Sequence, residues 1–534
     1  MSDLKDNQLQ YDSEIAHDQD HERWSRRLFL RSLGLTGAGA LLFGQMPVTA
    51  LSASPLAWLL SGLETDRILV LIRLKGGNDG VNMVIPVYDY GFYKTKRPGI
   101  AIPQNQVWSL SPELGMPNTM NPLQRLWQDG DMKVVHSVGY PEQNLSHFRS
   151  SDIWSSASDA NTLDESGWLG RWLDGNYPDY LTNPPANPPA IQIGGFGNLA
   201  FNNDENVSLS VIVSRPEDLA ELAKNGQLYD PNNVPECYYG EQLSYLRTVS
   251  NSTFRYASVI SAAYNKGKNA VEYAGNLGQQ LAMVARLIKG GLGTRLYMVT
   301  LDGFDNHANQ NNTHPALLNE LAAAVRHFYD DLNSGGWADK VLAMTISEFG
   351  RRIEQNASNG TDHGAAAPML LFGPGLNGNG FAGKTPNLRE VDAVGNLAFQ
   401  IDFRQVYASV LENWLCLSTT EVNQVLGRPF SRLPQLGLSC AATPVVERSA
   451  PQPLPLRASF REGQLTLFYN LPLAAEVDVQ LFSLDGRMVW QQAAGRQAAG
   501  EQVYSLGNLA RLPAGAYVAR VQAGRYAGSV KLIR

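Results

Sequence analysis

The strongest constraint on the fold is an alternation of short apolar runs with helical patterns between residues 68 and 430. After Thr313 and Pro315, for example, Leu318, Leu321 and Val325 recur at helical spacing on one face. The apolar runs have the length and composition of buried strands: 68–74, 133–138, 190–193, 295–301, 341–346 and 369–372. Strands that alternate with helices predict a doubly wound, mostly parallel α/β sheet.

The pattern changes near residue 445. Residues 441–454 are rich in proline, which is typical of a semi-rigid linker. Beyond them, apolar residues recur at every second position, as in the segments 465–469 and 477–481. The sequence therefore predicts an α/β domain over 66–440, a linker over 441–454 and a small all-β sandwich over 455–534.

Composition limits the class of protein. The chain has 534 residues, of which 44% are hydrophobic, enough for a sizeable core. A net charge of −7 without a basic block argues against nucleic acid as a partner. No stretch after residue 50 is long and apolar enough to span a bilayer. Cys237, Cys416 and Cys440 cannot form a disulfide framework; a Cys416–Cys440 bridge and unpaired thiols both stay open.

The N-terminal segment predicts export. Residues 25–31, SRRLFLR, match the twin-arginine signal, and the mild apolar stretch at 32–43 is too short for a transmembrane helix. Small residues at 50–53 offer a cleavage site. We expect residues 1–53 to be a signal peptide read by the twin-arginine translocon, which exports folded proteins. The protein would then reach the periplasm.

Polar clusters next to the apolar runs indicate a shared site. Asp305 and His307 follow the run at 295–301, Glu348 follows the run at 341–346, and Asp362 with His363 precedes the run at 369–372. Open α/β sheets place their ligand sites at the carboxyl ends of strands. Carboxylates and imidazoles are metal ligands, so these five residues predict a divalent metal centre. The alternative is ordinary loop polarity and helix capping.

Other candidates complete the predicted site. Asp79 follows the first strand among glycines and is a further candidate metal ligand, or a turn-former. Ser146 is the candidate nucleophile, with His147 beside it as a second catalytic residue, although a Ser in this position is often a helix N-cap. Arg351, or Arg149, could hold an anionic group through paired donors, or form an ion pair.

These segments resemble a known family. The phrases GGND (76–79), SHFR (146–149), FDNH (304–307), SEFGR (347–351) and TDHG (361–364) resemble an exported bacterial family called domain of unknown function 1501. That family is similar to the alkaline phosphatase and sulfatase superfamily. The resemblance, over residues 66–430, implies an alkaline phosphatase-like sheet. It also implies a metal centre built from an Asp after the first strand, a Ser or Thr nucleophile, an Asp/His pair, an Asp-His-Gly and a final His.

The sequence departs from that pattern. Glu348–Phe349 falls where the Asp-His of Asp-His-Gly would be, and Phe349 cannot coordinate a metal. Alternatively, Asp362–His363 is that Asp-His pair and the final ligand is missing, since no His follows His363. We therefore expect one metal bound mainly by oxygens, which favours Mg, Mn or Ca over Zn without excluding Zn.

The C-terminal region carries a second resemblance. The segments VQLFSLDGRMV (479–489) and LPAGAYVARV (512–521), with a terminal KLI strand, resemble the C-terminal sorting domain of the type nine secretion system of Bacteroidetes-like bacteria. This implies transfer to the cell surface by the type nine secretion machinery. The alternative is a carbohydrate-binding or spacer sandwich.

Two functional hypotheses follow. The first is a metal-dependent hydrolase of phosphate or sulfate esters outside the cytoplasm, in which Ser146 or a water molecule attacks. The second is a non-catalytic cell-envelope binding protein that kept the fold with a degraded metal site. Either way, a shared centre requires Asp305 and His363 to lie within about 10 Å of each other.

Overall fold

The computed structural model describes residues 66–534 apart from short gaps. The predicted signal peptide (1–53) and residues 441–451 of the predicted linker lie outside the described residues. The domain boundaries drawn from the sequence stay predictions. The other gaps are 181–182, 195–196, 215–229, 231–232, 235–237, 377–379, 393, 462–463, 473, 484–487, 507–514, 524–525 and 534.

A nine-stranded sheet forms the centre of the larger body, in the order β13-β5-β12-β9-β1-β8-β6-β7, with β14 beside β5. The mostly parallel α/β sheet is thus confirmed. β1 is hydrogen-bonded in parallel to both β8 and β9, and its first five residues are buried because both faces are covered. The strands are β1 (Ile68–Lys75), β5 (Met132–Gly139), β6 (Ala190–Ile193), β7 (Ser210–Val213), β8 (Leu296–Asp302), β9 (Val341–Ser347), β12 (Ala367–Phe372), β13 (Gly380–Ala382) and β14 (Ile401–Asp402).

One strand runs against the others. β12 is antiparallel to both β5 and β9, whereas the sequence predicted it as one more strand of the mostly parallel sheet. The short hairpin of β10 (Gly350–Gln355) and β11 (Thr361–Gly364) joins β9 to β12, and no helix lies between them. A parallel return needs a crossover connection, so the chain comes back antiparallel.

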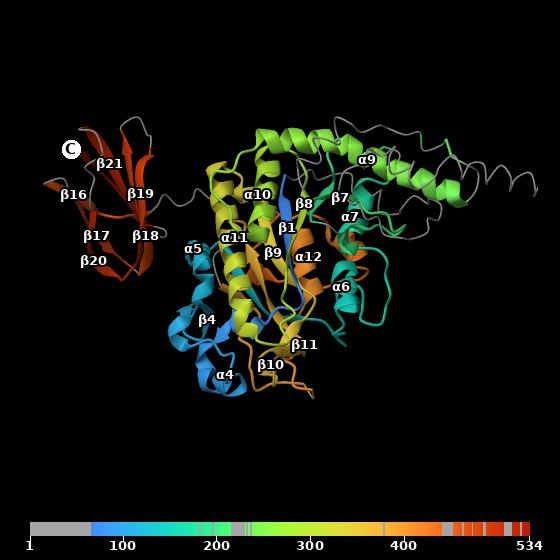
Figure 1. Cartoon of the computed structure of the whole chain (residues 1–534), viewed down its shortest axis with the longest axis horizontal. Coiled ribbons are helices and arrows are strands. Elements are labelled where there is room, and N and C mark those ends of the chain that lie inside the picture. Colours follow the sequence, from blue (N-terminus) through green and yellow to red (C-terminus); the bar gives the residue numbers. More distant parts are fainter. Residues whose placement is uncertain are drawn as a thin grey trace, which may run out of the picture.

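Helices lie on both sides of the central strands (Figure 1), as in a doubly wound sheet. Asp402 and Gln405 form a capping box at the start of α12, where the sequence predicted a helix. Thr313 is the N-cap residue of α11, but its hydroxyl accepts a hydrogen bond from Asn306 instead of capping the helix. The helices are α3 (Gly80–Met83), α4 (Tyr90–Lys96), α5 (Gln124–Asp129), α6 (His147–Ser156), α7 (Trp168–Asn176), α9 (Tyr238–Lys266), α10 (Gly275–Lys289), α11 (His314–Ser334), α12 (Phe403–Asn413) and α13 (Thr419–Val425).

Smaller sheets complete the structure. β2 (Ile85–Pro86), β4 (Leu114–Pro117) and β3 (Val107–Ser109) form a three-stranded sheet near α4. The C-terminal strands form two sheets around a hydrophobic core of their own, as predicted for a small β-sandwich, and are drawn in red in Figure 1. One contains β15 (Gln452–Pro453), β22 (Tyr526–Ile533), β21 (Ala516–Ala523), β18 (Ala475–Ser483) and β19 (Met488–Gln497); the other contains β16 (Leu456–Arg461), β17 (Gln464–Leu471) and β20 (Gly500–Leu506).

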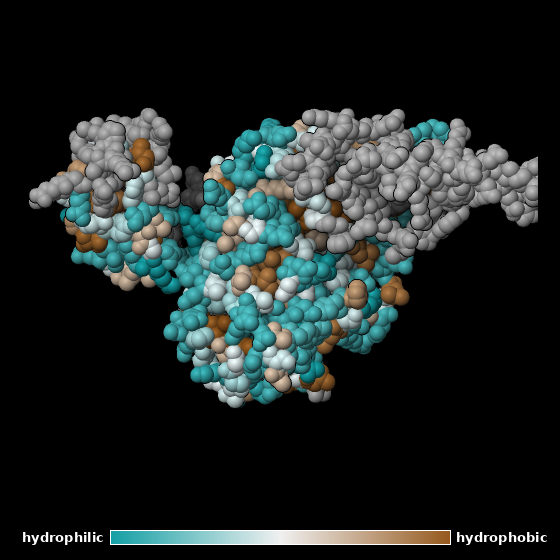
Figure 2. All heavy atoms as spheres, in the orientation of Figure 1, coloured by the Kyte–Doolittle hydropathy of each residue, from teal (hydrophilic) through white to brown (hydrophobic). Residues whose placement is uncertain are grey.

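A disulfide joins Cys416, after α12, to Cys440, which settles one of the open alternatives. Nearby, the Arg67 guanidinium donates to the backbone carbonyls of Trp414 and Ser439, so the segment before β1 is held against the segments that contain the two cysteines. Within the described residues, none of the helices has the length and hydropathy needed to cross a membrane. The face in Figure 2 is mostly hydrophilic, with hydrophobic residues in small groups.

Candidate metal centre

Asp305 lies in the loop that follows β8, at the carboxyl end of the sheet. The turn after β1 approaches this loop closely: a Cβ added to Gly76 would lie 2.4 Å from the backbone nitrogen of Asp305. Gly76 also has a φ of +116°, so the position needs glycine for both reasons. Gly76 of the GGND phrase therefore allows the Asp305 loop to pack against the end of β1.

His363 is placed by the β10–β11 hairpin. It lies opposite Arg351 in the register of these two strands. Its Nδ1 lies 2.7 Å from the carbonyl oxygen of Leu145, and its Nε2 lies 3.3 Å from Asp305 Oδ1. Because a carbonyl only accepts hydrogen bonds, Nδ1 carries the proton and the lone pair of a neutral ring is on Nε2, facing Asp305. The convergence of Asp305 and His363, 58 residues apart in sequence, is confirmed.

His147 is the first residue of α6 and enters the cluster from another side. Its Nδ1 lies 2.9 Å from Glu348 Oε1, and its Nε2 lies 3.4 Å from Asp305 Oδ2. The buried carboxylate fixes the orientation of the ring, in the way that carboxylates orient metal-binding histidines. His147 was predicted as a catalytic residue; its geometry fits a metal ligand instead.

Glu348 supports the cluster by holding His147 in place. Its Oε1 accepts from the Gly76 backbone N–H and from His147, while its buried Oε2 has no hydrogen-bond partner among the described residues. The sequence predicted Glu348 as a metal ligand, but its contacts show a carboxylate that orients the candidate metal ligand His147.

His307 adds a third imidazole. Its Nε2 lies 3.0 Å from Asp305 Oδ1 and 2.9 Å from His363 Nε2. Asp362 lies behind this ring: its Oδ1 is 3.8 Å from His307 Nδ1 and accepts a hydrogen bond from Asn356. Asp362 therefore borders the cluster on the far side of His307, which does not support its predicted place as a ligand.

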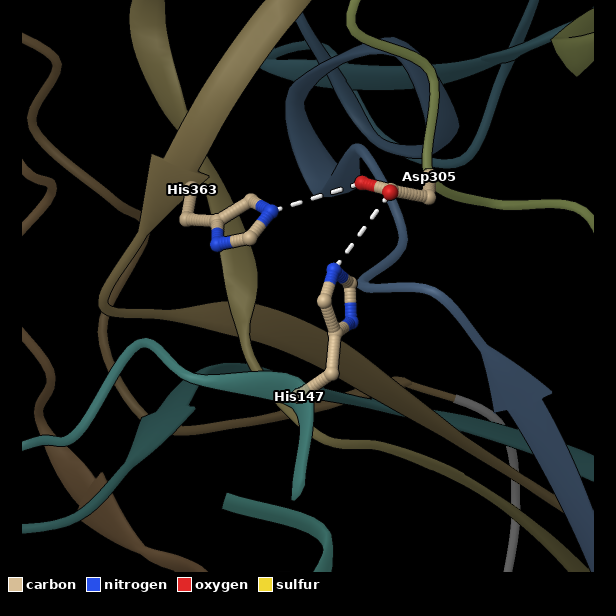
Figure 3. Close-up of side chains that lie close together, drawn as sticks. All are labelled: His147, Asp305 and His363. Atoms are coloured by element: carbon tan, nitrogen blue, oxygen red, sulfur yellow. Dashed lines mark hydrogen bonds and ion pairs between the residues drawn. The ribbon is translucent and has the colours of Figure 1, made fainter. Parts of the chain in front are cut away.

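The cluster has the composition of a metal site. The ligand atoms of His147, Asp305 and His363 all lie within 4.8 Å of one another, and Figure 3 shows these side chains pointing toward a common centre. Separations of roughly 3–3.5 Å are those expected between atoms bound to one ion at about 2.0–2.2 Å. With His307, the donors are three nitrogens and one carboxylate. The expected predominance of oxygen ligands is therefore not what the described residues offer.

Protonation states also suit a metal. Burial opposes the ionisation of Asp305, but the hydrogen bond and charge of Arg351, with the nearby imidazoles, keep its pKa below the ordinary value. Burial lowers the pKa of His363, although its hydrogen bond to Leu145 works against this. At neutral pH the pair is thus a carboxylate and a neutral imidazole, the forms that bind metals.

Phe349 closes the floor of the cluster. The ring is 1% exposed, and its centroid lies 5.0 Å from that of His147 and 4.3 Å from that of His363. A Cβ on Gly77 would meet this ring at 2.2 Å. The Phe349 side chain has no atom that can coordinate a metal, but its ring packs against His147 and His363 and fixes the planes of their imidazoles.

Arg351 forms the ion pair that the sequence left open as the alternative to anion binding. Nε donates to Gly77 O at 2.7 Å, Nη1 to Thr361 O at 2.9 Å, and Nη2 to Asp305 Oδ1 at 2.7 Å. Nη2 also contacts the carbonyls of Gly76 and Phe304. The guanidinium is 1% exposed and its donors are in use, so it clamps the loops of the site together and has none left for a substrate.

Asp79 has the turn-forming role that the sequence left open as the alternative to metal binding. It is buried at the N-cap of α3, where Oδ1 accepts from the Val81 N–H and Oδ2 pairs with Arg97 and Gln310. Burial opposes the charge, but Arg97 keeps the pKa of this carboxyl below its ordinary value. Both oxygens are satisfied and the charge is balanced, so the described contacts do not support a metal-ligand role.

Ser146 is exposed and occupies the N-cap position of α6 without a side-chain capping bond. Its neighbours Leu145 and His147 both contact the cluster, but among the described residues its own hydroxyl makes no hydrogen bond. Its predicted role as a nucleophile stays a prediction. The buried Ser150 bonds to Tyr140 and to the Glu348 carbonyl and is structural.

A mostly parallel α/β sheet and a His/Asp cluster at its carboxyl edge thus define an α/β protein with a candidate metal centre. Residues 133–433 match the family described as "Protein of unknown function (DUF1501)". This is more than half of the chain, and the protein belongs to this family. No curated protein matches the sequence.

Among solved structures, the chain is similar to a protein in the alkaline phosphatase superfamily from Vibrio parahaemolyticus, with 11% identity over 83% of this chain and 80% of that chain and a TM-score of 0.26. It is also similar to the lipoteichoic acid synthase LtaP from Listeria monocytogenes, with 10% identity over 83% and 90% and a TM-score of 0.29. For the PsFucS1 sulfatase from Pseudoalteromonas sp., the identity is 10% over 82% and 83%, with a TM-score of 0.29. Similarities this weak do not establish a function.

Proposed function

We propose that the protein is a metal-dependent hydrolase of phosphate or sulfate esters. The observation that carries this proposal is the convergence of His147, His307 and His363 on Asp305, with the Nδ1 atoms of His147 and His363 held by an acceptor. Anchored histidines around a carboxylate are typical of metal sites. The side chains of His147, His307 and Asp305 are 35%, 46% and 47% exposed, which leaves room for a substrate.

The donor set favours a transition metal, with zinc as the first candidate. Imidazole nitrogens suit zinc, iron, copper and nickel, whereas magnesium and calcium prefer oxygen ligands. A divalent metal held here would polarise the ester and lower the pKa of a water molecule. The residues of the chain contribute the binding site: Glu348 orients His147, Leu145 orients His363, and Arg351 holds the loops in place.

Ester cleavage tests this function directly. Metal-loaded wild type should cleave p-nitrophenyl phosphate or p-nitrophenyl sulfate, and His363→Ala should abolish the activity. If Ser146 is the nucleophile, Ser146→Ala should abolish cleavage while metal content stays intact; if water attacks directly, Ser146→Ala should remain active. Wild type that binds metal but cleaves neither ester, nor any other phosphate or sulfate ester, would rule out the hydrolase.

A non-catalytic envelope-binding protein is the second candidate. Two observations favour it: Phe349 occupies a position where the superfamily pattern has a ligand, and the Ser146 hydroxyl makes no hydrogen bond among the described residues. On this hypothesis the metal would stabilise the loops at the sheet edge and not act on an ester. Metal binding without any ester cleavage is the result that selects it.

We also propose export through the twin-arginine translocon and delivery to the cell surface by the type nine secretion machinery. The disulfide supports an oxidising compartment, and the separate core of the C-terminal sandwich fits a sorting domain. Deletion of residues 455–534 should leave a folded, metal-binding protein in the periplasm. Normal surface display of the truncated protein would refute the sorting role.

A further inference from the structure

Arg73 lies on β1, two residues before the end of the strand that leads into the candidate metal centre. Its Nη2 donates to the Ser151 hydroxyl at 2.9 Å. Ser151 follows His147 by four residues in α6, so both side chains share one face of the helix. One helical turn rises about 5.4 Å. Ser151, which binds Arg73, is therefore one turn along α6 from His147.

The charge of Arg73 has no close counterion. Within the described part of the chain, no carboxylate lies within ion-pair distance of it, and Ser151 is its hydrogen-bond partner. Asp152, the next residue of α6, feels the charges of Arg73 and Arg149, yet burial still raises its pKa. The side chain is half-buried. Ser151 engages one nitrogen of this guanidinium, which carries five N–H donors, so several donors are left for another acceptor.

Two other arginines near the centre differ from Arg73. The N–H groups of Arg351 contact backbone carbonyls, Asp305 and His307. Arg149 donates to the carbonyls of Ala160 and Thr162 in the loop after α6. Lys75, on the same face of β1 as Arg73, is paired with Asp302. Arg73 thus has the most unused N–H donors among these cations, because its one hydrogen bond within the described residues goes to Ser151.

We propose that Arg73 binds the charged oxygens of a tetrahedral oxyanion, the phosphate or sulfate group of the substrate, beside the metal centre. This proposal rests on the proposed function and names a specificity-determining residue for it. The planar guanidinium presents paired donors that match two oxygens of such a group. Ser151 holds the guanidinium by one nitrogen, which orients the remaining donors.

Isothermal titration of the full-length, metal-loaded protein with inorganic phosphate, and separately with sulfate, tests this role. Arg73→Gln should weaken binding of the preferred anion by about tenfold or more, because charge-assisted hydrogen bonds are lost. Metal content and melting temperature should stay as in wild type. Arg73→Lys, which keeps the charge without the paired donors, should bind with intermediate affinity. Arg326→Gln removes a guanidinium paired with Asp330 on α11 and should bind like wild type.

Unchanged anion affinity in Arg73→Gln would overturn the proposal, as would a metal-loaded wild type that binds neither anion. If Arg73→Gln does not fold, Arg73→Lys decides: wild-type affinity in that variant counts against the paired-donor role. The experiments distinguish failure of the proposed hydrolase function from failure of the proposed role of Arg73. Anion binding that depends on Arg73 without ester cleavage contradicts the hydrolase alone, whereas cleavage by Arg73→Gln with an unchanged KM contradicts Arg73 alone.

Discussion

The Nε2 atoms of His307 and His363 lie 2.9 Å apart at the edge of the Asp305 carboxylate. The Nδ1 of His363 is committed to the Leu145 carbonyl, so its Nε2 is an acceptor when the ring is neutral. Two imidazole nitrogens and a carboxylate this close either share a proton or share a cation. The third imidazole, His147, approaches the same carboxylate from α6 and makes the shared cation the better account.

Glu348→Gln tests the support of the cluster. Loss of the carboxylate charge next to His147 Nδ1 should lower metal affinity by about 10- to 100-fold, as for other partners that orient metal ligands. Competition with a chelator measures the affinity. The control is Glu354→Gln, which changes an exposed residue of β10 paired with Lys96 of α4; this variant should bind metal as wild type does. Equal affinity in both variants would show that Glu348 does not orient a ligand.

Asp79→Asn separates a structural role from a ligand role. The substitution leaves Arg97 buried without its counter-charge, and removal of one partner of a buried pair costs about 3–5 kcal/mol of unfolding free energy. Urea unfolding measures the loss. Asp302→Asn breaks the exposed pair with Lys75 and should change stability little. Folded Asp79→Asn protein should keep its metal; loss of metal without loss of stability would restore Asp79 as a ligand.

The Cys416–Cys440 bridge should stabilise the α/β domain. Closure of a loop with a sequence separation of 24 contributes typically about 2–4 kcal/mol. Reductant should therefore lower the melting temperature of wild type. Cys440→Ser should melt at the reduced wild-type temperature, and reductant should not change it further. A wild type that melts at one temperature with and without reductant would contradict this contribution.

Asp331 predicts a pH dependence of stability. Its buried carboxylate bonds to Lys289, Asn269 and the Ala270 N–H. Burial opposes its charge, but these partners hold its pKa below the ordinary value. Its contribution is therefore complete above the unfolded pKa of about 3.9 and is lost as the pH falls through the lower folded pKa. Thermal melts should show a gap between wild type and Asp331→Asn at neutral pH that narrows below about pH 4. A constant gap would contradict this.

The sequence predicted much of the fold and the centre of the site, but not its details. The run 68–74 is apolar throughout because β1 is covered on both faces, and such strands are readable from composition. Asp305 and His363 were placed together because both border apolar runs of one sheet. The pairing of Asp79 with Arg97 depends on a contact between α3 and the end of α4, which no local pattern encodes.

The assignment of His147 shows the same limit. Its place beside Ser146 resembled a catalytic pair, while its metal-facing nitrogen depends on Glu348, 201 residues away. The sequence gives no sign that the buried Glu348 carboxylate, after β9, orients His147 and is not itself a metal ligand. That role depends on a contact between two segments that are distant in the sequence. For Arg351, the sequence could not decide between anion binding and an ion pair, since its carbonyl partners lie on three different segments.

Metal content of the purified full-length protein tests the central claim most directly. Elemental analysis by mass spectrometry should find about one equivalent of a transition metal per chain in wild type, with zinc the first candidate. His363→Ala should lose most of it with an unchanged circular dichroism spectrum, whereas Asp302→Asn should keep it. Wild type without stoichiometric metal after exposure to zinc, manganese and iron, or His363→Ala with wild-type metal content, would contradict a metal centre built on Asp305 and the three histidines.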